Sequence, residues 1–288
     1  MSTILTPFKA CFFNYRENLF KDVSVSTAVA AQAVSLRIDS HGSQIFGRLM
    51  VPARMRAEER TPVVLLLHGY PGWEKNLDVA YALCRAGVAC AYFSYRGVWG
   101  SHGDYSFTHI LEDTNTMLAY LRENAAQYAI DPAHMYLIGH SLGGFSALLT
   151  AAGGADLRGV IMIAPCDLGQ LCLDKSVIYE QLMSRQTVGY FRLSAPDALE
   201  KEAEQYAKEW RFLSAAAQLP DHLPVHLIGA ANDEITPPEL NILPLYHRLE
   251  ELGRPTSYLE IDDGHNFVSH RITLIGKVFD LIEQMEQA

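Results

Sequence analysis

A serine between two glycines is the feature of the chain that most directly suggests chemistry. Residues 139–143 read GHSLG, which fits the pattern G-x-S-x-G with Ser141 at its centre. The apolar run MYLI precedes this motif, and the helix-forming run FSALLTAA follows it. A serine at a tight turn between a strand and a helix exposes its hydroxyl to a substrate. The motif therefore predicts that Ser141 is the nucleophile of an acyl-transfer reaction.

A serine hydroxyl is a weak nucleophile unless a nearby base takes its proton and a carboxylate orients that base. Downstream of the serine, Asp233 follows the apolar run HLIGA, and His265 follows the run YLEI and a short turn. Each of the three residues comes just after a predicted strand, in an order that is hard to obtain by chance. We predict that His265 is the general base and that Asp233 orients it.

Five neighbouring residues are alternatives for these roles. Glu234 could be the acid, although it would otherwise be a surface carboxylate at the start of a helix. Asp262 and Asp263 are expected to shape the turn before the histidine, because neighbours in a tight turn rarely face each other. His270 is expected in the last helix as a surface or packing residue. His140 is expected to pack inside the turn of the nucleophile and to form a hydrogen bond there.

The negative charge that develops in acyl transfer needs two hydrogen-bond donors. Residues 68–72 (HGYPG) end the strand VVLLL, and Pro71 has no N–H to donate. We predict that the backbone amides of Tyr70 and Leu142 form this oxyanion hole, with the Tyr70 ring beside the acyl pocket. The alternative is that HGYPG is only a turn after a buried strand.

The strands and helices that would position these residues can be predicted from the hydrophobic pattern. Short apolar runs alternate with longer amphipathic stretches, which is typical of a parallel sheet between helices. The first two strands flank a His-Gly turn and are expected to form an antiparallel hairpin. Asp131-Pro132 is expected to be a turn before the fifth strand. The predicted strands are 33–40, 44–51, 62–69, 88–95, 134–141, 159–165, 223–230 and 256–262. The predicted helices are 75–86, 107–127, 142–152, 238–252 and 269–286.

One interval is too long for a simple crossover between strands. Residues 166–222 are rich in Leu, Tyr, Glu and Lys at helical spacing. We expect a helical cap or lid over the edge of the sheet where open α/β sheets bind ligands. The expected organisation is an N-terminal extension over residues 1–32, a core over 33–165 and 223–288, and this lid. An elaborated crossover with no role at the site is the alternative.

The segments LLLHGYPG, YLIGHSLGGFSA, IGAANDEITPP and DDGHNF resemble the α/β-hydrolase superfamily. Within it, residues 33–286 are most similar to the catalytic domain of the prolyl-oligopeptidase and acylaminoacyl-peptidase-like group and its stand-alone esterase relatives. The resemblance implies the α/β-hydrolase fold, with an eight-stranded, mostly parallel sheet. It also implies hydrolysis of carboxylic esters or amides through an acyl-enzyme, with Ser141, Asp233 and His265 as the triad. No cofactor or metal is expected.

The peptidases of this group carry an additional N-terminal propeller, whereas about 32 residues precede the first predicted strand here. This difference favours a small or medium acyl ester as the substrate. An aminoacyl or peptide amide hydrolase and an acyltransferase are alternatives that use the same triad. A non-catalytic binding protein is a more distant alternative. Arg96 and Trp99, in the loop after the fourth strand, are expected either to brace the site or to be structural.

The composition limits the classes of binding partner and the cellular compartment that we expect for this protein. The formal charge is −10 and Lys and Arg do not cluster, which excludes nucleic acid and anionic membranes as expected partners. The N-terminus lacks the apolar core of a signal peptide, and the apolar runs are too short to span a bilayer. We expect a cytoplasmic protein with a small-molecule ester or amide substrate. A homodimer is an open alternative to a monomer. The five cysteines show no metal or disulfide spacing: Cys11, Cys84, Cys90, Cys166 and Cys172.

Overall fold

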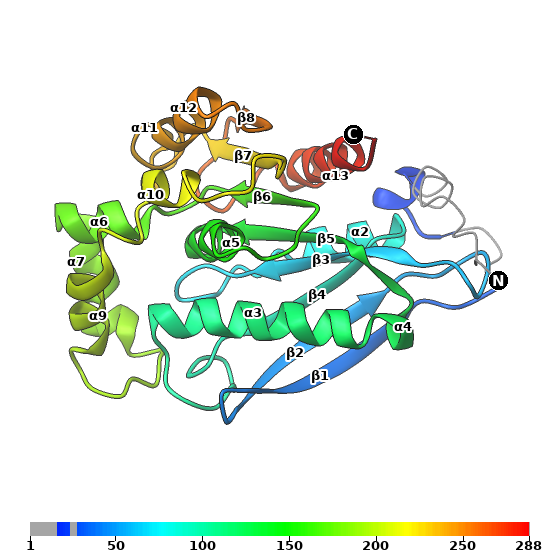
Figure 1. The fold of residues 1–288 in the computed structure, drawn as a ribbon, viewed down its shortest axis with the longest axis horizontal. Coiled ribbons are helices and arrows are strands. Elements are labelled where there is room, and N and C mark those ends of the chain that lie inside the picture. The colour runs from blue at the N-terminus through cyan, green and yellow to red at the C-terminus, as the bar shows by residue number, and fades with distance from the viewer. Residues whose placement is uncertain (1–15, 24–27, 288) are drawn as a thin grey trace.

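A computed structural model describes residues 16–23 and 28–287 of the chain. Most of the expected N-terminal extension over residues 1–32, including Cys11, lies outside these residues. The first described element is a short 3-10 helix, η1 (Arg16–Leu19). The described residues confirm an α/β fold with helices on both faces of one sheet (Figure 1).

The sheet has eight strands in the spatial order β1-β2-β4-β3-β5-β6-β7-β8. β2 is antiparallel to both β1 and β4, and every other neighbouring pair is parallel. The expected hairpin therefore forms one edge of the sheet. The strands are β1 (Gln32–Ser40), β2 (Ser43–Val51), β3 (Thr61–Leu67), β4 (Ala89–Ser94), β5 (Ile130–His140), β6 (Gly159–Ile163), β7 (Val225–Ala230) and β8 (Thr256–Ile261).

The central strands are continuous apolar runs because both of their faces are covered. All seven residues of β3 are buried, for example. Val63 and Leu65 face one hydrophobic core, and Val64 and Leu66 face the other. This alternation follows from the period of two along a strand. The cores on the two faces hold the sheet rigid, so the loops at the C-terminal ends of its strands are attached to a rigid support.

Helices cover the two faces separately. One face packs against α2 (Leu77–Arg85) and α13 (Arg271–Gln287). The other face packs against α3 (Phe107–Glu123), α5 (Leu142–Ala152) and α12 (Leu243–Glu251). Figure 1 shows α5 running beside β5, the strand that leads into it. None of the helices in the described part of the chain is both long and apolar enough to cross a membrane.

Two predicted helices and one predicted turn differ from the structure. The helix expected over 107–127 is interrupted at Asn124 and continues as the short α4 (Ala125–Tyr128). The helix expected over 238–252 is two helices, α11 (Pro238–Asn241) and α12. The Asp-Pro dipeptide lies inside β5 rather than in a turn before it, because the strand begins at Ile130. A bulge absorbs it, since pairing with β3 jumps from Ile130 to Met135.

Residues 166–222, which we call the insert, join β6 to β7. They form α6 (Leu168–Asp174), α7 (Val177–Met183), α8 (Arg185–Val188), α9 (Ala198–Tyr206) and α10 (Phe212–Ala216). Figure 1 shows α6, α7 and α9 beyond the C-terminal ends of the parallel strands. The buried carboxylate of Asp167 accepts the amides of Gln170 at 3.0 Å and Phe212 at 3.1 Å. Asp167 therefore ties the two ends of the insert together, and burial raises its pKa to about 6.

A pH-dependent contact docks the last helix on the sheet. The carboxylate of Glu286 lies 2.8 Å from the imidazole of His134 and accepts the hydroxyl of Tyr136. The hydrogen bond with Glu286 raises the pKa of His134. A histidine with a raised folded-state pKa adds stability below its unfolded pKa, and this stability is lost as the pH rises through the folded value.

We therefore expect His134→Gln to destabilise the protein more at pH 5.5 than at pH 8.5. The partly exposed pair limits the pH-dependent part to about 0.5–1 kcal/mol. Urea unfolding of both proteins at the two pH values measures it. Tyr136→Phe is the control, because it removes a bond to the same carboxylate without removing the imidazole. Equal losses for His134→Gln at both pH values would contradict the prediction.

Candidate active site

Ser141 lies in a strained turn between β5 and α5. Its backbone has φ 56° and ψ −121°, a conformation that L-residues rarely adopt. The turn is tight, because a Cβ on Gly143 would collide with the carbonyl of Leu67 in β3. The amide of Ser141 donates to the carbonyl of Ile163 at 2.9 Å, which anchors the turn to β6. The predicted geometry of the G-x-S-x-G motif is therefore present.

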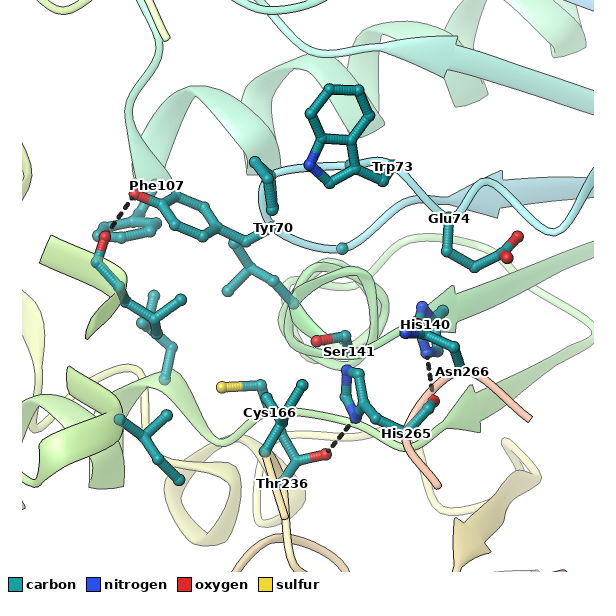
Figure 2. A pocket seen from close by; sticks show the side chains of 18 residues that line it. Tyr70, Trp73, Glu74, Phe107, His140, Ser141, Cys166, Thr236, His265 and Asn266 are labelled. Carbon is teal, nitrogen blue, oxygen red and sulfur yellow. Dashed lines mark hydrogen bonds between the residues drawn. The ribbon is translucent and has the colours of Figure 1, made fainter. Parts of the chain in front are cut away.

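His265 and Asp233 meet beside this turn, although 32 residues separate them. The imidazole Nδ1 of His265 lies 2.7 Å from Oδ2 of Asp233. The side chain of Asp233 is 1% exposed and that of His265 is 10% exposed. Figure 2 shows the imidazole next to Ser141 at the floor of a pocket. Nδ1 is engaged by the carboxylate, so Nε2 is the nitrogen left to accept a proton.

The carboxylate of Asp233 is held by its own turn. Its Oδ1 accepts the amides of Ile235 at 2.9 Å and Thr236 at 2.8 Å. The Thr236 hydroxyl lies 2.9 Å from Oδ2 and 3.2 Å from Nδ1 of His265. Burial alone would raise the pKa of Asp233, but the hydrogen bond and charge of His265 and the Thr236 donors outweigh burial and lower it. The carboxylate therefore stays ionised beside the imidazole.

Thr236 was missed by the reasoning from sequence. Its position three residues after Asp233, next to Pro237, was the available signal, since such a residue can close a turn on the carboxylate. Its hydroxyl also lies 3.0 Å from the carbonyl of Ala164, which links the turn after β7 to the end of β6. Thr236 thus contacts the acid, the histidine and the neighbouring strand.

The alternative candidates are placed elsewhere. Glu234 is exposed. Asp263 accepts the amides of Gly264 and Ser269, both at 2.8 Å, so it shapes the turn that presents His265. His270 precedes α13 instead of lying in it, and it contacts Asp263.

His140 contacts the loop that carries His265. Its Nε2 lies 3.0 Å from the backbone carbonyl of His265, and its ring is buried. Burial lowers the pKa of His140 to about 3. The ring is therefore neutral at pH 7, and its N–H donates to this carbonyl. The packing role and the hydrogen bond expected for His140 are both present.

The turn after β3 lies directly against Ser141. A Cβ on Gly69 would lie 2.9 Å from the Cβ of Ser141, so only glycine permits this approach. The indole of Trp99 donates to the carbonyl of Pro71 at 2.8 Å and braces the same turn. The amide of Leu142 opens α5 and has no acceptor within the helix. The structure therefore brings the segment of Tyr70 and the start of α5 to the same serine.

Arg96, in the same loop as Trp99, has a structural position. Its guanidinium is buried, and Nε lies 2.6 Å from the carboxylate of Asp113 in α3. The amide of Arg96 also donates to this carboxylate at 2.7 Å. The pair fixes the start of the loop after β4 on α3, and neither residue lines the pocket.

A pocket of about 220 Å³ opens above Ser141 (Figure 2). Its apolar lining comes from Tyr70, Phe107, Leu142, Cys166, Leu168, Ile178 and Leu182. Glu74, His140 and Asn266 line the pocket on the side of His265, across Ser141 from Phe107, and Trp73 also lines it. Helices α6 and α7 of the insert supply part of the apolar wall. The site therefore offers a nucleophile between an apolar end and a polar end.

Tyr70 connects the turn after β3 to the insert. Its hydroxyl donates to the carbonyl of Leu182 at 3.0 Å, and its ring stacks on Phe191 at 4.6 Å between centroids. Burial raises the pKa of Tyr70, so the hydroxyl keeps its proton and remains a donor. The ring borders the apolar end of the pocket.

Comparisons with known proteins agree with this architecture. A protein-family model described as BD-FAE matches residues 49–181. The quorum-quenching protein AidA of Acinetobacter baumannii is 32% identical over 118 residues, which are 39% of this chain and 38% of AidA. The chain thus matches well under half of the length of this curated relative.

Two similar structures cover nearly the whole chain. Est1E from Butyrivibrio proteoclasticus, solved with bound ferulic acid, has a TM-score of 0.69 and 19% identity, covering 88% of this chain and all of Est1E. The acylaminoacyl peptidase of Pyrococcus horikoshii has a TM-score of 0.67 and 17% identity, covering 89% of this chain and 42% of the peptidase. The predicted resemblance to the α/β hydrolases and the predicted fold are both confirmed.

Proposed function

We propose that this chain, which has the α/β-hydrolase fold, is a serine hydrolase that cleaves carboxylic esters of small or medium acyl groups through an acyl-enzyme. The observation that carries the proposal is the convergence of Ser141 and His265 in one pocket, with Asp233 buried behind the imidazole. Three separate strand-to-helix connections supply these residues. The 2.7 Å contact between His265 and Asp233 orients the imidazole, and the strained turn presents the serine.

In the proposed reaction, Nε2 of His265 takes the proton of Ser141 as its Oγ attacks the ester carbonyl. Within the described part of the chain no hydrogen bond joins the two side chains, so they must come into alignment when the substrate binds, as catalytic hydrogen bonds often do. The imidazolium returns its proton to the leaving alkoxide. Water then hydrolyses the acyl-enzyme by the same steps, and Asp233 stabilises the imidazolium in both.

The amides of Tyr70 and Leu142 are the proposed donors to the oxyanion. The first lies in the turn that touches Ser141, and the second follows the nucleophile at the start of α5. The partial positive charge of the helix N-terminus adds to the stabilisation. Donors fixed by backbone geometry need no rearrangement when charge develops on the carbonyl oxygen. Each donor of this kind lowers the activation barrier by about 3–4 kcal/mol.

An ester is favoured over a peptide by the small pocket, to whose apolar wall α6 and α7 contribute. The bound ferulic acid of Est1E shows that an aromatic carboxylic acid can occupy a relative of similar fold. An amide hydrolase or an acyltransferase would use the same triad and differ in the leaving group or acceptor.

The test is a panel of p-nitrophenyl esters and aminoacyl p-nitroanilides, with a fluorophosphonate as a label for an activated serine. We expect hydrolysis of short and medium esters, slower release from the anilides, and a covalent adduct that peptide mass spectrometry assigns to Ser141. A protein that turns over no member of the panel and takes no label would refute the proposal. Faster release from the anilides would assign an amide hydrolase instead.

The Tyr70 ring is expected to limit the length of the acyl group. Tyr70→Ala should raise the ratio of kcat/KM for octanoate over acetate esters about ten-fold, because the vacated space accepts more methylenes. Tyr70→Phe keeps the ring and loses only the bond to Leu182, so its ratio should stay within about three-fold of wild type. Steady-state kinetics on both p-nitrophenyl esters measure the ratio. An unchanged ratio in Tyr70→Ala would place the end of the acyl pocket elsewhere.

A further inference from the structure

The hydroxyl of Thr236 lies between the two side chains that have to be oriented for the proposed reaction. It is 2.9 Å from Oδ2 of Asp233 and 3.2 Å from Nδ1 of His265. In Figure 2 a dashed line joins it to the imidazole. Thr236 is buried, so water competes little for these contacts. One hydroxyl therefore contacts both partners of the pair that lies 2.7 Å apart.

Hydrogen bonds restrain the Asp233 carboxylate at both of its oxygens. Oδ1 accepts the amides of Ile235 and Thr236. In the described part of the chain, the donors to Oδ2 are the imidazole and the Thr236 hydroxyl. A single hydrogen bond from Nδ1 would fix a distance but would let the ring of His265 tilt about it. The hydroxyl oxygen gives Nδ1–H a second acceptor, and such supporting hydrogen bonds hold a catalytic side chain in its productive orientation.

Thr236 is also tied to the segment that holds the nucleophile. Its hydroxyl lies 3.0 Å from the carbonyl of Ala164, the residue after β6. Ala164 has φ 41°, a left-handed conformation that is costly for a residue with a side chain. The amide of Ser141 donates to Ile163 at 2.9 Å, and its carbonyl accepts the amide of Cys166 at 3.0 Å. The four residues from Ile163 to Cys166 therefore connect the backbone of the serine to the hydroxyl of Thr236.

We propose that Thr236 is a positioning residue, whose hydroxyl sets the orientation of the His265 imidazole relative to Ser141 by holding Asp233. This inference rests on the proposed serine hydrolase function and adds a residue to its site. The hydroxyl keeps its one proton, which the Asp233 carboxylate and the carbonyl of Ala164 share, and no covalent bond to it forms or breaks. Orientation of the base counts when Nε2 takes the serine proton, so the contribution should fall on kcat more than on KM.

The test compares Thr236→Val with Thr236→Ser in steady-state hydrolysis of p-nitrophenyl acetate. Valine has nearly the shape of threonine and keeps the amide bond to Oδ1, but it removes the hydroxyl. We expect Thr236→Val to lower kcat about ten-fold with KM within about two-fold of wild type. Thr236→Ser keeps the hydroxyl and should restore most of kcat. Thermal unfolding checks the fold, and Thr236→Ala, which removes the same hydroxyl, should repeat the loss.

Thr150→Val is the matched control, because it removes the hydroxyl of another buried threonine. In the described part of the chain this hydroxyl has no hydrogen-bond partner, so it contacts neither Asp233 nor His265. Its kcat and KM should equal those of wild type.

A double-mutant cycle with Asp233→Asn separates positioning through the acid from a purely structural role. Once the carboxylate is gone, the hydroxyl has no oriented acid to hold. We therefore expect Thr236→Val to cost less than about two-fold in the Asp233→Asn background. A full ten-fold loss there would overturn the inference, because the two effects would then be independent.

Two further results would overturn the inference. One is a kcat of Thr236→Val and Thr236→Ala within about two-fold of wild type. The other is an equal loss in Thr236→Ser, since it would show that shape matters and the hydroxyl does not. All of these outcomes presuppose a wild-type protein that cleaves p-nitrophenyl esters. A wild type that neither cleaves them nor takes the fluorophosphonate label would refute the proposed function itself.

Discussion

Ser141→Ala is expected to lower kcat/KM for p-nitrophenyl esters by at least about 10⁴-fold. Alanine removes the Oγ that forms the acyl-enzyme, and the pocket has no second nucleophile in its place. The thiol of Cys166 also lines the pocket, but burial raises its pKa, so it remains protonated and unreactive. Removal of a nucleophilic serine elsewhere costs up to about 10⁶-fold, with binding and the oxyanion donors supplying what remains.

The strain at this turn makes the folding control essential. Alanine at φ 56° meets the same backbone constraint as serine, so thermal unfolding of Ser141→Ala should match wild type closely. Cys166→Ala is the companion variant, and it should retain both esterase activity and labelling by the fluorophosphonate. Ester hydrolysis that persists in Ser141→Ala and disappears in Cys166→Ala would move the nucleophile to the thiol.

The sequence predicts those residues of the candidate site that a local motif specifies. Ser141 is specified by glycines within two positions, and Asp233 and His265 each follow a strand that its apolar run reveals. Parallel strands bring their C-terminal ends to one edge, so the three residues meet without any need to predict packing. The fold class follows from the same strands, because runs buried on both faces require helices on both sides.

Other features depend on contacts between distant segments, which a local pattern does not contain. The contact of Thr236 with His265 requires the turns after β7 and β8 to meet. The bond from Tyr70 to Leu182 requires the insert to fold back on the turn after β3. One miss was avoidable, since Pro244 near the start of α12 signals the interruption of the helix expected over 238–252.

Asp233→Asn is expected to lower kcat/KM by about 10³–10⁴-fold while leaving the fold intact. The carboxylate accepts the proton of Nδ1 and so keeps Nε2 of His265 free to receive the proton of the serine. An asparagine amide can instead donate to Nδ1, which moves the ring proton to Nε2 and blocks the base. Steady-state kinetics on one good ester, with Glu234→Gln as the control, measure the effect. A variant near wild-type activity would mean that Asp233 does not orient the base.

The same substitution has a second readout that separates orientation from general damage. The pKa of Asp233 is lowered in the folded protein, so its ionisation adds stability above its unfolded pKa, and this stability is lost as the pH falls through the folded value. The difference in unfolding free energy between wild type and Asp233→Asn should therefore be larger at pH 7 than near pH 3. A pH-independent difference together with a large kinetic loss would indicate that the substitution disturbs the turn of Thr236 instead of the charge beside His265.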